Sequence, residues 1–241
     1  MSSASPDWLD ALGSAELAER RRACDAAIDE LRRRPELGRH LRRVLRGGSR
    51  EASFAAAYVL FQAQGPSPGL LPALVESLDL PDADARWQAL EMLVALGRRR
   101  PEVLEGLLRR FRAGEPALRR RMLLYALRDL EPADPTVEAA LVEGLDDGDA
   151  DVRRAAAVCL ARLTRPDLGT LDRLLEIARG DPDARLRRIA AAVVPALLGP
   201  HPGRRPEAER LLRGLSSHPD PAIARAARAG LARLAPAGSS G

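Results

Sequence analysis

A short pattern of small and apolar residues recurs about every 33 residues along this chain. In its clearest copy an acidic turn at 147–151 precedes Val152 and Arg153, and small or apolar residues then follow at offsets of three and four. Such offsets place side chains on one face of an α-helix. The position of Arg153 in the pattern is filled along the chain by Arg21, Ser53, Arg86, Arg120, Arg153, Arg187 and Ala224. Neighbouring members of this series are 32 to 37 residues apart, so we predict about seven copies of one structural unit.

A second amphipathic segment lies between each of these helices and the next. The six segments are 37–45, 70–78, 103–111, 137–145, 168–178 and 206–215. Turns rich in Pro, Gly and Asp separate many of the elements, as at 65–69 and 180–183. Each unit is therefore predicted to be a pair of helices, whose apolar faces are buried only when neighbouring pairs stack.

The composition agrees with an all-α fold. Hydrophobic residues make up 46% of the chain but aromatic residues only 3%. The apolar content comes mainly from Ala and Leu, which are strong helix formers. The β-branched and aromatic residues that favour strands are scarce.

The skeleton of the clearest copy, Val152-Arg153-x-x-Ala156-x-x-Cys159-Leu160-x-x-Leu163, resembles the HEAT-repeat family. It is most similar to the short bacterial form that is also found in phycobilisome lyases. The resemblance implies a right-handed α-solenoid, a superhelix of about seven HEAT-like helical hairpins. It also implies that arginines of the pattern are structural, with Asp147 and Arg153 forming one rung of an Asp–Arg ladder. We expect an N-terminal tail over 1–14, a single HEAT-like repeat domain over 15–234 and a flexible C-terminal tail over 235–241.

Neither the charge of the chain nor its N-terminal sequence indicates export or membrane association. All 38 basic residues are Arg, the formal net charge is +4, and nucleic-acid-binding proteins usually carry a clearer basic excess. The first residues lack the pattern of a signal peptide, and no apolar stretch is long enough to span a bilayer. We therefore expect a cytoplasmic bacterial protein that does not associate with membranes.

The sequence contains no recognisable catalytic, metal or cofactor motif. His40, His201 and His218 are far from one another and are expected to be solvated surface residues. Cys24 and Cys159 have no metal-ligand spacing, and both fall on small core positions, where we expect buried, unreactive thiols. We therefore expect no enzymatic activity, no metal and no cofactor.

Candidate binding residues emerge from the register of the repeat. In the HEAT family the second helix of each pair lines the concave side, and five of the chain's seven aromatic residues fall off the core stripe of these helices. Aromatic residues and Arg are enriched at binding hot spots; the alternative is that bulky side chains fill gaps between Ala-rich helices. The candidate partner-binding residues are Phe54, Tyr58, Phe61, Trp87, Glu91, Arg121, Tyr125, Arg128, Arg154 and Arg188.

Three functions are compatible with these patterns. The leading hypothesis is a non-catalytic scaffold or adaptor that binds a protein or peptide through the concave face. The second is a nucleic-acid-binding protein resembling HEAT-like alkylpurine DNA glycosylases, in which Trp87, Glu91 and either Arg121 or Arg128 would act together. The tryptophan-rich motif of that family is absent, however, and the acid is a Glu. The third is a phycobilin-lyase-like protein, which rests on the repeat resemblance alone. The identity of the partner and the oligomeric state are left open.

Overall fold

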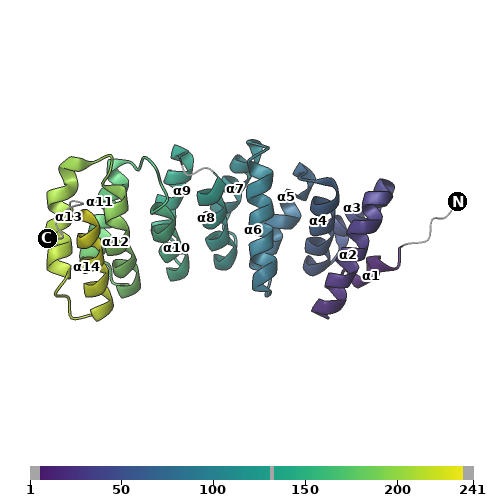
Figure 1. The fold of residues 1–241 in the computed structure, drawn as a ribbon, viewed down its shortest axis with the longest axis horizontal. Coiled ribbons are helices and arrows are strands. Elements are labelled where there is room, and N and C mark those ends of the chain that lie inside the picture. Colours follow the sequence, from purple (N-terminus) through teal and green to yellow (C-terminus); the bar gives the residue numbers. More distant parts are fainter. Residues whose placement is uncertain (1–5, 131–132, 236–241) are drawn as a thin grey trace. The chain divides into compact units, whose positions relative to one another are not determined.

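The computed structural model describes residues 6–130 and 133–235, and none of these residues lies in a β-strand (Figure 1). The all-α prediction is confirmed. The α-helices are α1 (Trp8–Ala11), α2 (Leu17–Arg33), α3 (Gly38–Gly47), α4 (Arg50–Gln64), α5 (Leu71–Glu76), α6 (Ala83–Gly97), α7 (Glu102–Arg112), α8 (Ala117–Leu130), α9 (Pro135–Leu145), α10 (Ala150–Leu160), α11 (Leu168–Gly180), α12 (Ala184–Leu197), α13 (Arg205–Leu215) and α14 (Pro221–Leu234). Short 3₁₀ helices are η1 (Pro35–Leu37), η2 (Pro68–Leu70), η3 (Ser77–Asp79) and η4 (Pro202–Arg204).

The chain forms two compact units, residues 1–126 and residues 127–241, which we call unit 1 and unit 2. In unit 1, α2 packs on α4 and α4 packs on α6, so these helices form one layer. The intervening helices form a second layer, in which α3 and α5 contact α4, while α5 and α7 contact α6. This alternation is the stacking that paired helices need in order to bury their apolar faces.

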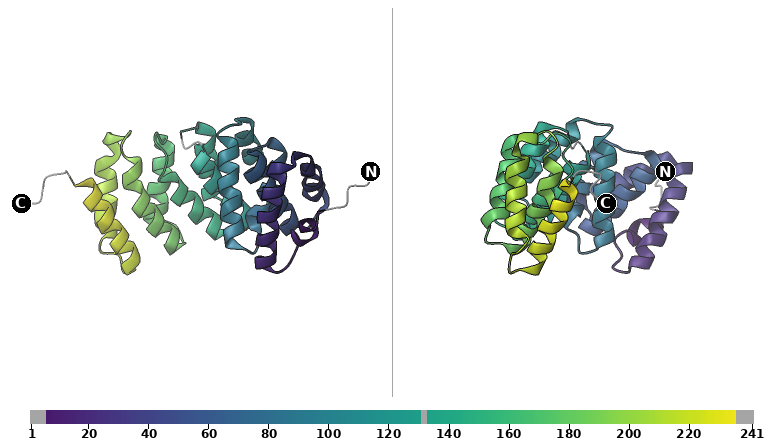
Figure 2. Two further views of the ribbon diagram at one scale, coloured as in Figure 1. Left: turned by 45° about the vertical axis from the view of Figure 1, so that its right-hand side comes forward. Right: turned by 60° about the vertical axis from the view of Figure 1, so that its left-hand side comes forward.

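Unit 2 repeats the same arrangement. Helices α10, α12 and α14 contact one another in sequence order, and α9, α11 and α13 each pack against the helix that follows (Figures 1 and 2). No described helix combines the length and the apolar content needed to cross a membrane.

The core follows the predicted register. In α6 the side chains of Ala89, Met92, Leu93 and Leu96, at the predicted offsets, are all buried. Most of the intervening segments also form one continuous helix, as 103–111 does in α7. The segment 70–78 instead divides into η2, the six-residue α5 and η3.

The arginine of the repeat contacts the backbone rather than an acidic side chain. Arg153 Nη1 donates hydrogen bonds to the carbonyl oxygens of Asp147 at 2.7 Å and Gly148 at 3.1 Å. The Asp147 carboxylate instead accepts from the backbone N–H of Asp149 at 2.8 Å. Arg153 is therefore structural, as expected, but among the described residues its contacts tie the preceding turn to its own helix, and none is with the Asp147 carboxylate.

In the first copy of the repeat the arginine contact is made one residue earlier than predicted, while the predicted core residues Cys24, Ala27, Ile28 and Leu31 are all buried. Arg86 Nη1 donates to the carbonyl oxygen of Leu80, six residues earlier, at 2.5 Å. The matching contact in α2 is made by Arg20, which donates to the Ser14 carbonyl oxygen at 2.6 Å. Arg20, and not Arg21, therefore has this structural role, and Arg21 is left exposed on α2.

A packed helix precedes residue 15. Trp8 of α1 is buried, and its Nε1 donates a hydrogen bond to Glu30 Oε2 on α2 at 2.6 Å. Leu12 is also fully buried. At the other end, the expected C-terminal tail over 235–241 lies, apart from residue 235, outside the described residues.

A network of charges, largely buried at Arg119, Asp79 and Glu115, links α8 to α5, η3 and α7. The Arg119 guanidinium contacts Glu76 Oε2 at 2.8 Å, Asp79 Oδ1 at 3.0 Å and Glu115 Oε2 at 2.6 Å. Arg110 on α7 joins it through Glu115, at 2.6 Å, and through Glu76. Burial opposes the charge of Arg119, but its hydrogen bonds to Asp79 and Glu115 outweigh that effect and hold its pKa above the usual range.

Candidate partner-binding surface

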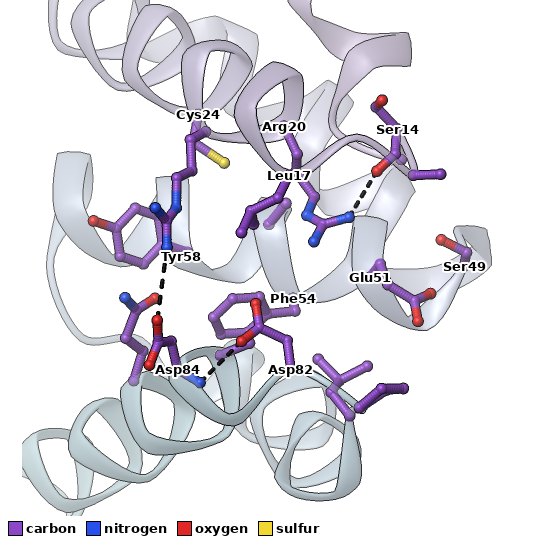
Figure 3. Close-up of a pocket in the computed structure, with 18 of the residues that line it drawn as sticks. Ser14, Leu17, Arg20, Cys24, Ser49, Glu51, Phe54, Tyr58, Asp82 and Asp84 are labelled. Atoms are coloured by element: carbon purple, nitrogen blue, oxygen red, sulfur yellow. Dashed lines mark hydrogen bonds and ion pairs between the residues drawn. The ribbon is translucent and has the colours of Figure 1, made fainter.

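A cavity of about 620 Å³ opens in unit 1 between α2, α4 and α6 (Figure 3). Phe54 and Tyr58, two of the candidate binding residues, contribute their rings from α4. Leu17 lines it from α2 and is exposed. The cavity therefore combines aromatic and aliphatic surface in a recess that solvent can enter.

The local sequence of α4 explains why its aromatic rings face this cavity. Phe54 and Tyr58 are four residues apart on one helix face, with ring centroids 6.3 Å apart. The residues between them, Ala55 to Ala57, are buried and small. The core side of α4 is thus filled by Ala, and the two rings remain half-buried at its surface.

Charged side chains surround the cavity. Its lining includes the guanidinium groups of Arg20 and Arg21 and four carboxylates, which belong to Asp25, Glu51, Asp82 and Asp84. Arg21 reaches from α2 toward Asp84 on α6, with 3.7 Å between Nη2 and Oδ2. Both side chains are more than half exposed, so this ion pair adds little stability.

A second aromatic feature lies on α6 and α8. The rings of Trp87 and Tyr125 stack with centroids 5.8 Å apart and an interplanar angle of 21°. The stack is open to solvent, because 47% of Trp87 is exposed. Glu91, one turn after Trp87, is also exposed.

Burial separates the seven aromatic residues into two groups. Trp8 and Phe111 are core residues, 7% and 6% exposed. Phe54, Tyr58, Phe61 and Tyr125 are half-buried and Trp87 is exposed. Filling of gaps between Ala-rich helices therefore accounts for the first group, whereas the second group leaves ring surface facing solvent.

Arg154 and Arg128 of the candidate arginines pair with carboxylates. Arg154 Nε lies 2.8 Å from Asp183 Oδ2, which links α10 to the start of α12, and its Nη1 lies 2.9 Å from Asp151 Oδ1. The hydrogen bond with Asp183 raises the pKa of Arg154 above its usual range. Arg128 binds the Asp129 carboxylate through two contacts of 2.7 Å.

The other candidate arginines differ in exposure. Arg121 is half-buried on α8, while Arg188 is exposed on α12. The arginine series that the sequence predicted is therefore not uniform, and part of it holds helices together.

The prediction that all three histidines are solvated is wrong for His40. Its side chain is buried, because it shares the inner face of α3 with Leu41. Its Nε2 accepts a hydrogen bond from Arg39 Nε at 3.3 Å. The arginine-rich neighbourhood suggested exposure, but the helical phase relative to Leu41 decides the position.

The two cysteines are unreactive, and His201 and His218 do not line the cavity. Burial raises the pKa of the Cys24 thiol to about 11 and that of Cys159 to about 12, so both thiols are protonated at neutral pH, as the sequence predicted. His201 Nε2 lies 2.8 Å from the Pro166 carbonyl oxygen, and His218 Nδ1 accepts from the Asp220 backbone N–H. Within the described ranges, no three His, Cys, Asp or Glu side chains are grouped as metal ligands would be.

Sequence reasoning missed residues of α2 and α4 that line the cavity. Leu17, Asp25 and Glu51 were not candidates, because only fixed offsets from the arginine position were considered. Leu17 offered a signal, since an isolated Leu in the first turn of an otherwise polar helix segment has no core role in the repeat pattern.

Comparison with known proteins supports the repeat assignment. Residues 130–195 match the family model described as HEAT repeats. A search of curated protein sequences finds no match.

Several solved structures are similar to this chain. A crystal structure of a Kap121p mutant has a TM-score of 0.59 at 14% identity; the match covers 94% of this chain and 28% of that chain, and it supports the fold alone. A designed armadillo repeat protein has a TM-score of 0.47 at 17% identity, covering 96% of this chain and 100% of the other. The complex of CpcE and CpcF of phycocyanin lyase from Nostoc sp. PCC7120 has a TM-score of 0.38 at 19% identity, covering 97% and 98%.

The repeat pattern, the alternating helix layers within each unit and the family match lead to the same assignment. Residues 130–195 are HEAT repeats, and the chain is an all-α repeat protein of the α-solenoid class, as its sequence predicted.

Proposed function

We propose that this protein is a non-catalytic scaffold or adaptor that binds a protein or peptide through the outward surfaces of α4, α6 and α8 in unit 1. We call this surface the aromatic face and define it by Phe54, Tyr58, Phe61, Trp87 and Tyr125. The observation that carries the proposal is the stack of Trp87 on Tyr125, in which an indole ring is held in place yet 47% exposed.

An exposed, ordered aromatic pair suits partner binding for two physical reasons. Large exposed apolar side chains that lie together are uncommon on monomeric proteins and often mark interaction sites. Trp and Tyr also lose little conformational freedom on binding, because each has only two rotatable side-chain bonds. Stacking between α6 and α8 restricts Trp87 before any partner arrives.

Polar groups beside the aromatic rings would form the rim of such an interface. Glu91 lies one turn beyond Trp87, and Arg121 lies one turn before Tyr125. A core of aromatic residues within a polar rim is the usual composition of a protein interface. Arg128 and Arg154 already have carboxylate partners, so the proposal places the affinity on the aromatic residues. Arg188, exposed on α12, stays a candidate contact in unit 2.

The test is affinity capture from a lysate of source cells, with and without nuclease. Wild type is compared with the double variant Trp87→Ala/Tyr125→Ala and with Leu168→Ala, which removes an exposed apolar side chain from α11. We expect one protein to be recovered with wild type and with Leu168→Ala, independently of nuclease, and to be lost with the double variant.

Binding of the purified partner then gives the magnitude. Loss of a central aromatic pair is expected to cost at least about 2 kcal/mol, which is roughly a 30-fold weaker dissociation constant. Circular dichroism should show unchanged helix content, because neither ring is in the buried core. Equal affinity of the wild type and the double variant would contradict the proposal. Recovery that nuclease abolishes, with affinity that falls steeply with salt, would favour a nucleic-acid partner instead.

A further inference from the structure

We infer that the cavity between α2, α4 and α6 binds an arginine or lysine side chain of a peptide segment in the partner. This inference rests on the proposed function, since it names the chemistry of a segment that a protein or peptide partner would insert beside the aromatic face. It commits to a cationic ligand because of the charge, the ring surface and the size of the cavity.

The charge of the cavity is opposite to that of the chain. Four carboxylates and two guanidinium groups line it, a formal excess of two negative charges, whereas the whole chain has a formal net charge of +4. The excess is therefore a local feature of this recess rather than a consequence of composition. Local potentials of one sign attract ligands of the opposite sign and orient them as they approach.

Several of the carboxylates are available to a ligand. Among the described residues, Asp25 and Glu51 have no hydrogen-bond or ion-pair partner, although Glu51 is half-buried. Asp84 has one ion-pair partner, Arg21, at 3.7 Å in an exposed and therefore weak pair. A ligand cation can replace Arg21 at Asp84 at small cost, because Arg21 can then return to solvent.

The guanidinium group of Arg20 does not compete for these carboxylates. It is held against the Ser14 carbonyl oxygen at 2.6 Å, the structural contact of the first repeat (Figure 3). Because Arg20 is used by the fold in this way, Arg21 is the only residue of α2 described as pairing with an acidic side chain of the cavity, and that pair is loose.

The aromatic floor gives a cation a second source of binding energy. Phe54 and Tyr58 present tilted rings to the cavity, and Figure 3 shows both rings between the side chains of α2 and the acidic residues of α6. A guanidinium or ammonium group over an aromatic ring is attracted by the negative face of the ring. The exposed side chain of Leu17 can cover the aliphatic part of an arginine or lysine.

The size of the cavity fits a side chain together with some of its backbone. Its volume of about 620 Å³ lies within the usual range for sites that bind small molecules, roughly 300–1,000 Å³. A phosphate group in this cavity would face Asp25, Glu51 and Asp84 with only Arg21 as a mobile counter-ion, so the excess of negative charge disfavours nucleic acid as the occupant.

The test uses an array of nine-residue peptides that contain one to three Arg or Lys, each paired with a peptide in which Glu replaces every basic residue. The strongest binder is then labelled with fluorescein and titrated with purified full-length protein, using fluorescence anisotropy. We expect the cationic member of each binding pair to be preferred. We also expect affinity to fall at least tenfold in Asp25→Asn/Glu51→Gln and in Tyr58→Ala.

Asp25→Asn and Glu51→Gln keep the shape of side chains that make no hydrogen bond among the described residues, so the double variant should fold normally. Glu105→Gln on α7 is the matched control, because it removes an exposed carboxylate from the other layer of the same unit. Equal binding of cationic and acidic peptides, or equal affinity of Asp25→Asn/Glu51→Gln and Glu105→Gln, would overturn the inference. Tighter binding of a labelled twelve-nucleotide DNA strand that competes with the peptide would overturn it as well.

Failure of the cationic site can be distinguished from failure of the proposed function. A partner that is lost with Trp87→Ala/Tyr125→Ala but retained by Asp25→Asn/Glu51→Gln would leave the proposed function standing and remove the cationic site. Cationic peptides that bind wild type but not Asp25→Asn/Glu51→Gln would support the cavity, even if no partner depended on the Trp87–Tyr125 stack.

Discussion

Gly230 on α14 lies directly against the carbonyl oxygen of Ala191 on α12. A Cβ atom at position 230 would be 3.2 Å from that oxygen and 3.3 Å from Pro195 Cγ. Pro195, inside α12, has no N–H to donate to Ala191 in the helix. The absence of a side chain at Gly230 thus allows α14 to approach α12 closely where Pro195 removes one helical hydrogen bond.

We predict that Gly230→Ala destabilises the protein, although Ala favours a helix over Gly by about 1 kcal/mol. The new methyl group would press on backbone, which cannot move aside as a flexible side chain can, and overpacking of this kind costs about 1–3 kcal/mol. Urea unfolding followed by circular dichroism measures the change.

Gly214→Ala on α13 is the control for this prediction. A Cβ there has no atom within 4 Å, so the substitution should raise the free energy of unfolding by up to about 1 kcal/mol. If Gly230→Ala were as stabilising as Gly214→Ala, the claim that α14 needs a glycine at position 230 to pack on α12 would be wrong.

We predict that Arg119→Ala is strongly destabilising. Arg119 is 6% exposed, and its removal leaves the poorly solvated carboxylates of Asp79 and Glu115 with only the partly exposed Arg50 and Arg110 as counter-ions. Breaking a buried ion pair in this way costs about 3–5 kcal/mol. Arg109→Ala removes a guanidinium from an exposed pair with Glu105 and should change stability by less than about 1 kcal/mol. Thermal unfolding of both variants beside wild type measures this difference. Similar melting temperatures for the two variants would refute the prediction that the buried Arg119 stabilises the fold more than the exposed Arg109 does.

Thiol reactivity should follow burial. With its pKa raised to about 11 by burial, Cys24 is ionised in roughly one molecule in a thousand at pH 8. We expect Ellman's reagent to modify the folded protein slowly at pH 8 and to modify both thiols rapidly in urea. Cys24, which lines the cavity, should react before the fully buried Cys159. A bound cationic peptide should slow the reaction at Cys24, and a Cys159→Ser variant isolates that rate.

Stability should fall in mild acid because of His40. Burial first, and then the neighbouring Arg39 and Arg43, lower the pKa of His40 below its ordinary value. In the unfolded chain His40 binds a proton near pH 6.5, whereas the folded protein resists that proton. The contribution of neutral His40 is therefore complete above about pH 6.5 and decreases as the pH falls from there toward the lowered pKa.

Urea unfolding at pH 7.5 and pH 5.0 measures this effect. His40→Gln, which retains a neutral acceptor for Arg39, should lose less stability between the two pH values than wild type does. An identical loss in both proteins would show that other groups cause the acid sensitivity.

The local pattern of this sequence predicted most of the helices and their buried faces, although it missed α1 and the division of 70–78 into three short helices. The offsets of three and four that place Ala89, Met92 and Leu93 in the core are a property of a single helix, so they can be recognised without knowing any neighbour. The same reasoning located α7 within a residue of its ends. Repetition of the pattern then predicted stacked helix pairs, because one pair cannot bury its apolar face alone.

Contacts between helices depended on the tertiary structure. Arg154 and Asp183 are 29 residues apart, and whether they meet depends on the distance and rotation between α10 and α12. The position of α2 relative to α6 likewise decides that Arg21 reaches Asp84, while Arg20 binds the backbone. The repeat period determined which residues form helices and which face is buried, whereas the cavity and the Trp87–Tyr125 stack arise from helix spacing, which a one-dimensional pattern does not contain.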